Sequence, residues 1–148
     1  KHENSMKVFY GCDGLNNINT IEGFDINTIP QEISYLSHFD ANSSEEATKT
    51  FVDNYKKKFN GETPSQFAAA AYDCVYALYD ALTAAGESKV NASMSAEEFC
   101  RVLKEQFDGS FTYSGVTGSN MKWTRSTSGA GYVEKTATKF VVKEADNA

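Results

Sequence analysis

The chain has 148 residues, of which 41% are hydrophobic and 13% aromatic, so it is long and apolar enough to bury a core. Its formal net charge of -6 argues against nucleic acid and anionic membrane surfaces as partners, because both reward clustered Lys and Arg. No stretch approaches the ~20 consecutive apolar residues of a membrane span. Three widely spaced cysteines and two histidines make no zinc motif, so neither a metal nor a cofactor is expected.

The first part of the chain predicts two strands joined by a long loop. One strand begins the stretch "KVFYGCDGL", Lys7 to Leu15, and the other is "EISYLSHF", with Ile33 and Tyr35 on one face. Residues 16–31 between them are rich in Asn, Thr and Gly and contain Pro30 near their end. This composition predicts a loop, or a short helix with irregular flanks.

Three helices are predicted within residues 43–107. The first is expected to start at a capping box made by Ser43 and Glu46 and to end at Gly61. The third starts at Ser95, which has Glu98 at the box position. The apolar spacing of this third helix predicts that it buries Phe99, Val102, Leu103 and Phe107.

The second helix, Phe67 to Ala85, differs from the others because apolar residues surround most of it. Its only charged residues are Asp73 and Asp80, which are seven positions apart and therefore on one side. Such a helix is normally buried on nearly every side. The few predicted strands cannot cover it, which indicates a missing partner and predicts an exposed apolar flank that favours self-association.

From Phe111 onward, short β-prone pieces separated by Gly, Ser and Thr predict a hairpin and a terminal strand. Strands therefore precede and follow a run of helices, and the fold class is α/β.

Asp13 stands between Cys12 and Gly14 at the end of the first strand, and three interpretations of this acid are open. Asp-Gly is a common turn pair, so the carboxylate can serve the backbone of a tight corner. It can also cap a short helix that follows it. Finally, open α/β sheets bind ligands beyond the carboxyl ends of parallel strands, where a carboxylate can hold an ammonium group.

An enzymatic alternative uses Cys12 as a thiol nucleophile and His38 as its base. Such catalysis requires a thiolate with a nearby proton acceptor, and both residues fall near predicted strand ends. The sequence motifs of the common hydrolases, metalloproteases and nucleotide-binding proteins are absent.

Four segments follow one another along the chain: "FYGCDGL", "EISYLSHFD", "FVDNYKKKFNGETPSQFAAAAYDCVYALYDAL" and "GVTGSNMKWTRSTSGAGYVEK". In this order they resemble the C-terminal half of type I periplasmic solute-binding proteins, especially the branched-chain amino-acid-binding group of ABC importers. The resemblance covers nearly the whole chain. It assigns residues 1–40 to second-lobe strands and loop, 43–107 to helices, and 111–148 to the hairpin and terminal strand.

The resemblance implies a partial three-layer architecture, a parallel sheet flanked by helices with both lobes incomplete. It also implies that Asp13 matches the second-lobe acid that holds the α-ammonium of the ligand, and that Phe67 matches an aromatic lining the cleft. Tyr10 and Tyr35 are further candidates for aromatic walls, since small-ligand sites combine apolar lining with a few polar anchors. Core packing is the competing interpretation for all three aromatic residues.

The function implied is non-enzymatic and extracytoplasmic. The parent protein would capture a small amino-acid-like solute by hinged closure and deliver it to the membrane permease of an ABC importer. A ligand-sensing domain of a receptor with the same architecture is the alternative, and sequence beyond this chain would discriminate the two.

Overall fold

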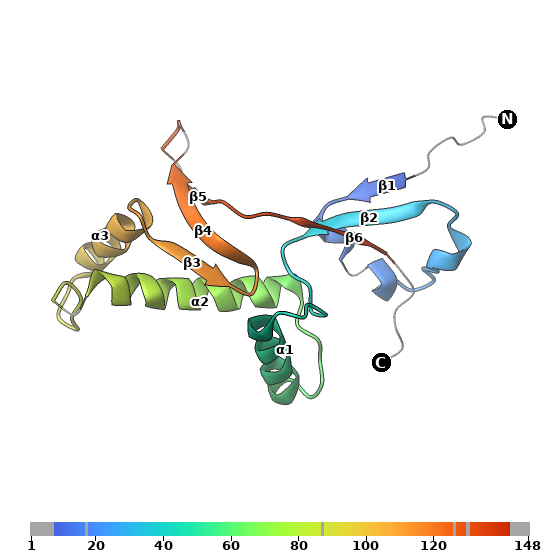
Figure 1. The fold of residues 1–148 in the computed structure, drawn as a ribbon, viewed down its shortest axis with the longest axis horizontal. Helices are drawn as coiled ribbons and strands as arrows, with labels where there is room; N and C mark the ends of the chain where they lie inside the picture. Colours follow the sequence, from blue (N-terminus) through green and yellow to red (C-terminus); the bar gives the residue numbers. More distant parts are fainter. Residues whose placement is uncertain (1–7, 17, 87, 126, 130, 143–148) are drawn as a thin grey trace. The chain divides into compact units, whose positions relative to one another are not determined.

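The computed structural model describes residues 8–16, 18–86, 88–125, 127–129 and 131–142, and Figure 1 shows its elements. The chain divides into two compact units, one made of Lys1–His38 and Ala137–Ala148 and the other of Phe39–Thr136. In the part of the chain that is described, no helix is long and apolar enough to cross a bilayer. Lys7, at the start of the stretch predicted to begin with a strand, and residues 143–148 of the segment predicted to contain the terminal strand lie outside the described residues.

The first unit contains a three-stranded sheet in the order β1-β2-β6. Its strands are β1 (Val8–Gly11), β2 (Glu32–Ser37) and β6 (Thr138–Val141). β1 and β2 are parallel, whereas β6 pairs with β2 in the antiparallel direction. The predicted irregular segment after β1 forms three short 3-10 turns, Asp13–Leu15, Ile18–Thr20 and Ile26–Thr28.

The second unit combines three helices with an antiparallel sheet in the order β3-β4-β5. The helices are α1 (Glu46–Lys58), α2 (Gln66–Ala85) and α3 (Ala96–Phe107), and the strands are β3 (Thr112–Gly115), β4 (Gly118–Arg125) and β5 (Gly131–Val133). α2 contacts both α3 and β3 (Figure 1). The α/β class is confirmed. Among the described strands, parallel pairing is confined to β1 and β2.

The two predicted capping boxes have different outcomes. At α3, Ser95 Oγ accepts a hydrogen bond from the Glu98 amide at 3.3 Å, and the Glu98 carboxylate accepts one from the Ser95 amide at 2.9 Å. The bond from the Ser95 amide, followed by a second from the Ser95 hydroxyl to the same carboxylate at 2.8 Å, lowers the pKa of Glu98. At α1 the prediction is wrong, because the helix starts at Glu46 itself and Ser43 Oγ instead accepts a hydrogen bond from the Glu45 amide at 3.2 Å.

Two hydrophobic clusters form the core of the second unit. One consists of Phe39, Phe51, Val52 and Ala69, and the other of Ala77, Tyr113 and Met121. α3 buries Val102 as expected, but Phe99 is exposed, so its predicted burial is wrong. Aromatic rings of α1 and α2 also pack in a continuous row, with centroid separations of 4.4 to 6.0 Å: Phe59, Tyr55, Phe51, Tyr72 and Tyr76.

Candidate functional site

Asp13 begins the 3-10 turn that follows β1. The register of the parallel pair sets Gly11, the last residue of β1, opposite Tyr35 of β2. Asp13 therefore comes two residues beyond the carboxyl end of a strand in a parallel pair, and its side chain is exposed. This is the edge at which open α/β sheets bind ligands, so the predicted ligand residue lies at a suitable position in its own unit.

The turn that carries Asp13 is fixed to the sheet by short-range contacts. The Asn16 amide donates to the Asp13 carbonyl at 3.0 Å, and the Tyr35 hydroxyl donates to Asn16 Oδ1 at 3.0 Å. Leu15 packs closely on Gly11, because a Cβ atom at this position would stand 2.1 Å from Leu15 Cδ1 and would force the leucine side chain to move. Asp13 is consequently positioned by both β1 and β2 rather than by a free loop.

The structure connects Tyr35 with the Asp13 turn but places Tyr10 elsewhere. Side chains alternate between the two faces of a sheet, and the register pairs Tyr10 with Ser34 but Gly11 with Tyr35. Tyr10 and Tyr35 therefore point to opposite faces of the β1-β2-β6 sheet. The ring of Tyr35 stacks on that of Phe140, with centroids 5.6 Å apart.

On its own face, Tyr10 is accompanied by an ion pair. Lys139 Nζ lies 5.3 Å from the centroid of the Tyr10 ring and 2.7 Å from Glu32 Oε1. The hydrogen bond from Lys139 lowers the pKa of Glu32, and the same bond raises the pKa of Lys139. This arrangement is a cation over an aromatic ring, so one side of the Tyr10 ring is already in contact with Lys139.

Phe67, the fourth predicted ligand residue, is the second residue of α2 and belongs to the other unit. Its ring is 61% exposed. The competing interpretation, that Phe67 packs in the core, does not hold for this side chain within the described structure.

The cysteines and histidine of the enzymatic alternative are also placed. Cys12 and His38 follow the carboxyl ends of β1 and β2, while Cys74 lies on α2 and Cys100 on α3; all three cysteines are free and exposed. Across the described residues, no group of three or more His, Cys, Asp or Glu side chains could hold a metal ion. The thiol-enzyme alternative stays as the sequence left it, a pair of residues near strand ends.

The sequence analysis gave no role to Asp73, an acid of the second unit that accepts four hydrogen bonds. Its side chain is 3% exposed. Oδ1 accepts hydrogen bonds from the Val116 amide at 2.9 Å and the Tyr113 hydroxyl at 3.3 Å. Oδ2 accepts from the amide and the hydroxyl of Thr117 at 2.8 and 2.5 Å, and Lys135 Nζ donates to the Thr117 hydroxyl at 2.6 Å.

This carboxylate explains an unusual β-turn between β3 and β4. Gly115 pairs with Gly118, so the connection has two residues, Val116 and Thr117. Two-residue hairpins normally use turns with positive φ, yet the non-glycine residues with positive φ in the described chain are Asn60 and Asn120. Asp73 instead captures both amides of the connection. The sequence signal that could have predicted this contact is a carboxylate within an apolar helix, followed later in the chain by the turn sequence "GVTG".

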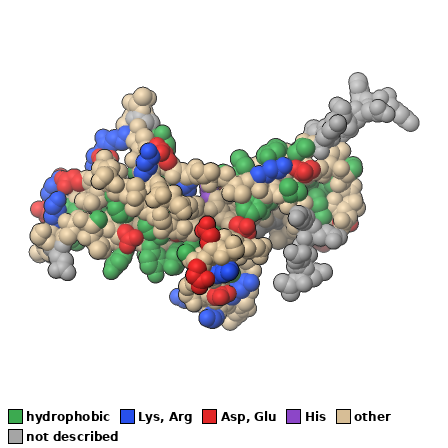
Figure 2. Space-filling model, in the orientation of Figure 1, with side chains coloured by type: hydrophobic (Ala, Val, Ile, Leu, Met, Phe, Trp, Pro, Cys, Tyr) green, Lys and Arg blue, Asp and Glu red, His purple; other side chains and the backbone are tan. Residues whose placement is uncertain are grey.

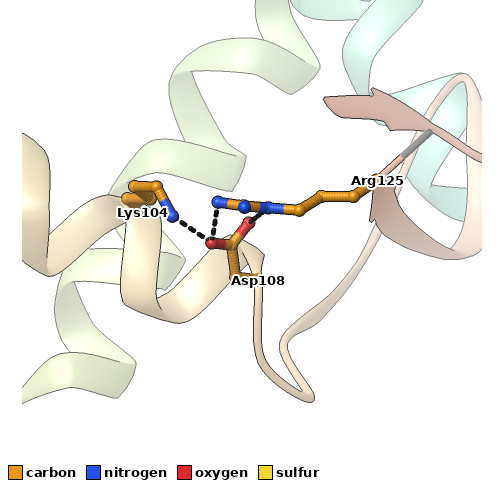
Figure 3. A network of polar contacts seen from close by, with 3 residues as sticks. All are labelled: Lys104, Asp108 and Arg125. Carbon is orange, nitrogen blue, oxygen red and sulfur yellow. Dashed lines mark hydrogen bonds and ion pairs between the residues drawn. The ribbon is translucent and has the colours of Figure 1, made fainter. Parts of the chain in front are cut away.

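A second polar cluster joins the end of α3 to β4 (Figure 3). Arg125 approaches Asp108 with two nitrogens, Nε at 2.9 Å from Oδ1 and a terminal nitrogen at 2.5 Å from Oδ2, and Lys104 pairs with the same carboxylate. The hydrogen bond from Arg125, followed by that from Lys104, lowers the pKa of Asp108. These side chains are solvent-accessible, and their ion pairs link the end of α3 to β4.

Comparison with known proteins identifies the class of fold. No protein-family profile matches the chain, and no curated protein matches it. Solved structures do match, and one of them, described as a branched-chain amino acid ABC transporter, does so with a TM-score of 0.61. This match confirms the resemblance to solute-binding proteins of ABC importers at the level of the fold.

Two of these structures can be named. A protein of Rhodospirillum rubrum, described as a branched-chain amino acid ABC transporter, is 25% identical over 91% of this chain, with a TM-score of 0.61. The substrate-binding protein LivJ of Streptococcus pneumoniae, solved with isoleucine, is 22% identical over 87% of this chain, with a TM-score of 0.49. The chain spans about a third of the length of each, 34% and 37% respectively.

Proposed function

We propose that the chain is the C-terminal portion of an extracytoplasmic, non-enzymatic solute-binding protein. Its parent binds a small amino-acid-like solute and delivers it to the membrane permease of an ABC importer. The observation that carries this proposal is the likeness to the Rhodospirillum rubrum protein over 91% of the chain at a TM-score of 0.61. The match spans 34% of that protein, and in this proposal the chain carries only part of the parent's site.

The mechanism follows from a two-lobed parent. A solute that binds the closed arrangement better than the open one shifts the population toward closure. The protein then needs no chemical step. It needs a small number of polar anchors and an apolar lining, the usual composition of a small-ligand site.

Asp13 is proposed as the anchor for the solute's ammonium group. Its exposed carboxylate sits at the carboxyl edge of the β1–β2 pair, on a turn that the Tyr35–Asn16 hydrogen bond ties to β2. A charge-assisted hydrogen bond from an ammonium is stronger than a neutral one, particularly once closure excludes water. Tyr35 is the proposed aromatic residue that contacts the turn carrying Asp13. Tyr10 and Phe67 are also proposed to line the ligand site, but no contact joins them to this turn in the described structure.

The proposal is tested by calorimetry on the full-length parent. A thermal-shift screen of the standard amino acids first finds the ligand, since a ligand specific for the native state raises apparent stability. Asp13→Asn should then weaken binding by about 1.5–3 kcal/mol, the range for a hydrogen bond to a charged group. This corresponds to roughly a 10- to 150-fold rise in Kd.

Two controls separate an ammonium contact from a general effect. Asp25→Asn changes another exposed acid of the same unit, whose carboxylate caps a 3-10 turn by accepting the Asn27 amide at 2.9 Å, and it should leave affinity unchanged. The hydroxy-acid analogue of the ligand lacks the ammonium group. It should therefore bind the wild-type protein and Asp13→Asn with the same low affinity. Unchanged amino-acid affinity in Asp13→Asn would remove the assignment, and a screen without any binder would count against solute binding itself.

A further inference from the structure

The two faces of the β1-β2-β6 sheet differ in chemistry. One face carries Tyr10 and the ion pair of Lys139 with Glu32. Figure 2 shows a basic and an acidic side chain among the hydrophobic ones over this sheet. The other face carries Tyr35 and Phe140, which are directly opposite each other in the antiparallel β2–β6 pair. The two tyrosines therefore have different neighbours.

A glycine brings the turn after β1 onto the face of Tyr35. Gly11 and Tyr35 are partners in the parallel register, so their Cα–Cβ directions point to the same side of the sheet. The position that a Cβ atom of Gly11 would take is 2.1 Å from Leu15 Cδ1. Leu15 therefore packs over the glycine on the face that carries Tyr35, and the next residue, Asn16, comes within reach of the tyrosine hydroxyl.

The Tyr35 side chain connects β6 with this turn. Its ring stacks on that of Phe140, with an angle of 21° between the ring planes. Its hydroxyl donates to Asn16 Oδ1 at 3.0 Å. The backbone amide of Asn16 donates to the Asp13 carbonyl, also at 3.0 Å. A continuous series of contacts therefore leads from β6, through Tyr35 and Asn16, to the residue proposed to hold the ammonium group.

We infer that Tyr35 and Asn16 are positioning residues for Asp13, because their hydrogen bond keeps the Asp13 turn in the place where its carboxylate receives the ammonium group. The inference rests on the proposed function, and it assigns Tyr35 an action through Asn16 in place of direct contact with the solute. Hydrogen bonds are directional, and a group that is already ordered loses less conformational freedom on binding. Loss of the Tyr35–Asn16 bond should therefore weaken the ammonium contact without abolishing it.

The first test needs no ligand and follows the turn itself in the 148-residue chain. Tyr35→Phe keeps the stacked ring and removes the hydroxyl. The amides of Leu15 and Asn16 donate hydrogen bonds within the turn, and their exchange with solvent is measured by NMR. Both should exchange about 3- to 10-fold faster in the variant, the effect expected for loss of one neutral hydrogen bond.

A second variant and a matched control accompany this measurement. Asn16→Ala removes the same bond from its other end and should accelerate exchange at Leu15 as much as Tyr35→Phe does. Asn27→Ala removes a side-chain hydrogen bond from another 3-10 turn of the same unit and should leave exchange at Leu15 unchanged. Unchanged exchange in Tyr35→Phe would overturn the inference. An equal acceleration in Asn27→Ala would also overturn it, by showing a general loosening of the unit.

The second test measures binding to the full-length parent by calorimetry. Tyr35→Phe should raise the Kd of the amino acid about 3- to 10-fold, which is less than the effect of Asp13→Asn. The Kd of the hydroxy-acid analogue should not change, because the analogue has no ammonium group. In the Asp13→Asn background, Tyr35→Phe should have no further effect on the amino acid, since its effect passes through Asp13.

The two tests distinguish failure of this inference from failure of the proposed function. Faster exchange with an unchanged amino-acid Kd would overturn the positioning role and leave solute binding intact. An equal loss of affinity for the amino acid and its analogue would also overturn that role, because it would reveal a general structural effect. A wild-type parent that binds no amino acid would refute the proposed function, and the positioning role with it, whatever the exchange rates.

Discussion

Replacing Asp73 by asparagine tests whether one buried carboxylate organises the second unit. The side chain accepts four hydrogen bonds, two on each oxygen, from Tyr113, Val116 and Thr117. An amide has a single accepting atom, so it can replace one oxygen at most. If the amide oxygen keeps the two Thr117 bonds, its nitrogen faces the Val116 amide. The Tyr113 hydroxyl can turn to accept, but the Val116 amide loses its acceptor.

The size of the effect follows from these contacts. An amide left without an acceptor costs about 1–3 kcal/mol, and hydrogen bonds to a charged group contribute more than neutral ones. Loss of a buried charge removes part of its desolvation penalty, which offsets some of the damage. We therefore expect Asp73→Asn to lower the free energy of unfolding by about 2–4 kcal/mol. With a urea dependence of about 2 kcal/mol per M, the midpoint falls by roughly 1–2 M.

The chain contains its own reporter for this measurement. Trp123, its single tryptophan, lies in β4 with its ring centroid 4.5 Å from that of Phe107, so its fluorescence follows unfolding of the second unit. Asp80→Asn is the matched control, because Asp80 is exposed on the same side of α2 and should change stability by less than about 0.5 kcal/mol. Equal midpoints for the two variants would refute the assignment of Asp73.

Two further predictions concern the same unit. Gly115→Ala should destabilise it by about 1–3 kcal/mol in the same urea assay, because the added Cβ would stand 2.2 Å from Asp73 Oδ1. Gly118→Ala, whose Cβ meets only a flexible methionine, should be milder, and the reverse order would contradict this reasoning. Asp108→Asn should reduce stability at neutral pH. Because Arg125 lowers the pKa of Asp108, the carboxylate's contribution is complete above about pH 4 and is lost as pH falls through the lowered pKa. Thermal unfolding of variant and wild type should therefore converge in acid, whereas a difference independent of pH would exclude the ion pair as its cause.

The order of elements was predictable because each has a strong local signal. Ser95 and Glu98 mark the start of α3, and the structure forms both bonds of the predicted box. The capping box predicted for Ser43 and Glu46 does not form, although these residues have the same spacing as Ser95 and Glu98. A capping box needs the acid at the third helical position, and α1 begins one residue after Glu45, which leaves Glu46 at the first. Spacing alone does not determine where a helix starts.

The candidate site was predictable only in part, because strand register determines which side chains meet. Asp13 was chosen as a candidate from its place after a strand and from the family resemblance, and the structure puts it at the carboxyl edge of a parallel pair. Tyr10 and Tyr35 were equivalent in the sequence as candidates for aromatic walls. The pairing of Gly11 with Tyr35 separates them onto opposite faces. That register depends on contacts between segments more than 20 residues apart, which no local pattern contains.

The burial of Asp73 and the exposure of the apolar side chains Phe67 and Val75 on α2 have the same structural cause. A helix can rotate about its axis while keeping its position, and hydrophobicity alone would turn Phe67 and Val75 inward. The hydrogen bonds from the β3–β4 connection to Asp73 fix the rotation instead, because both carboxylate oxygens must face Val116 and Thr117. With this rotation, side chains half a turn away necessarily point outward. The apolar composition of α2 predicted an exposed apolar flank, and the buried carboxylate determines which side chains form that flank.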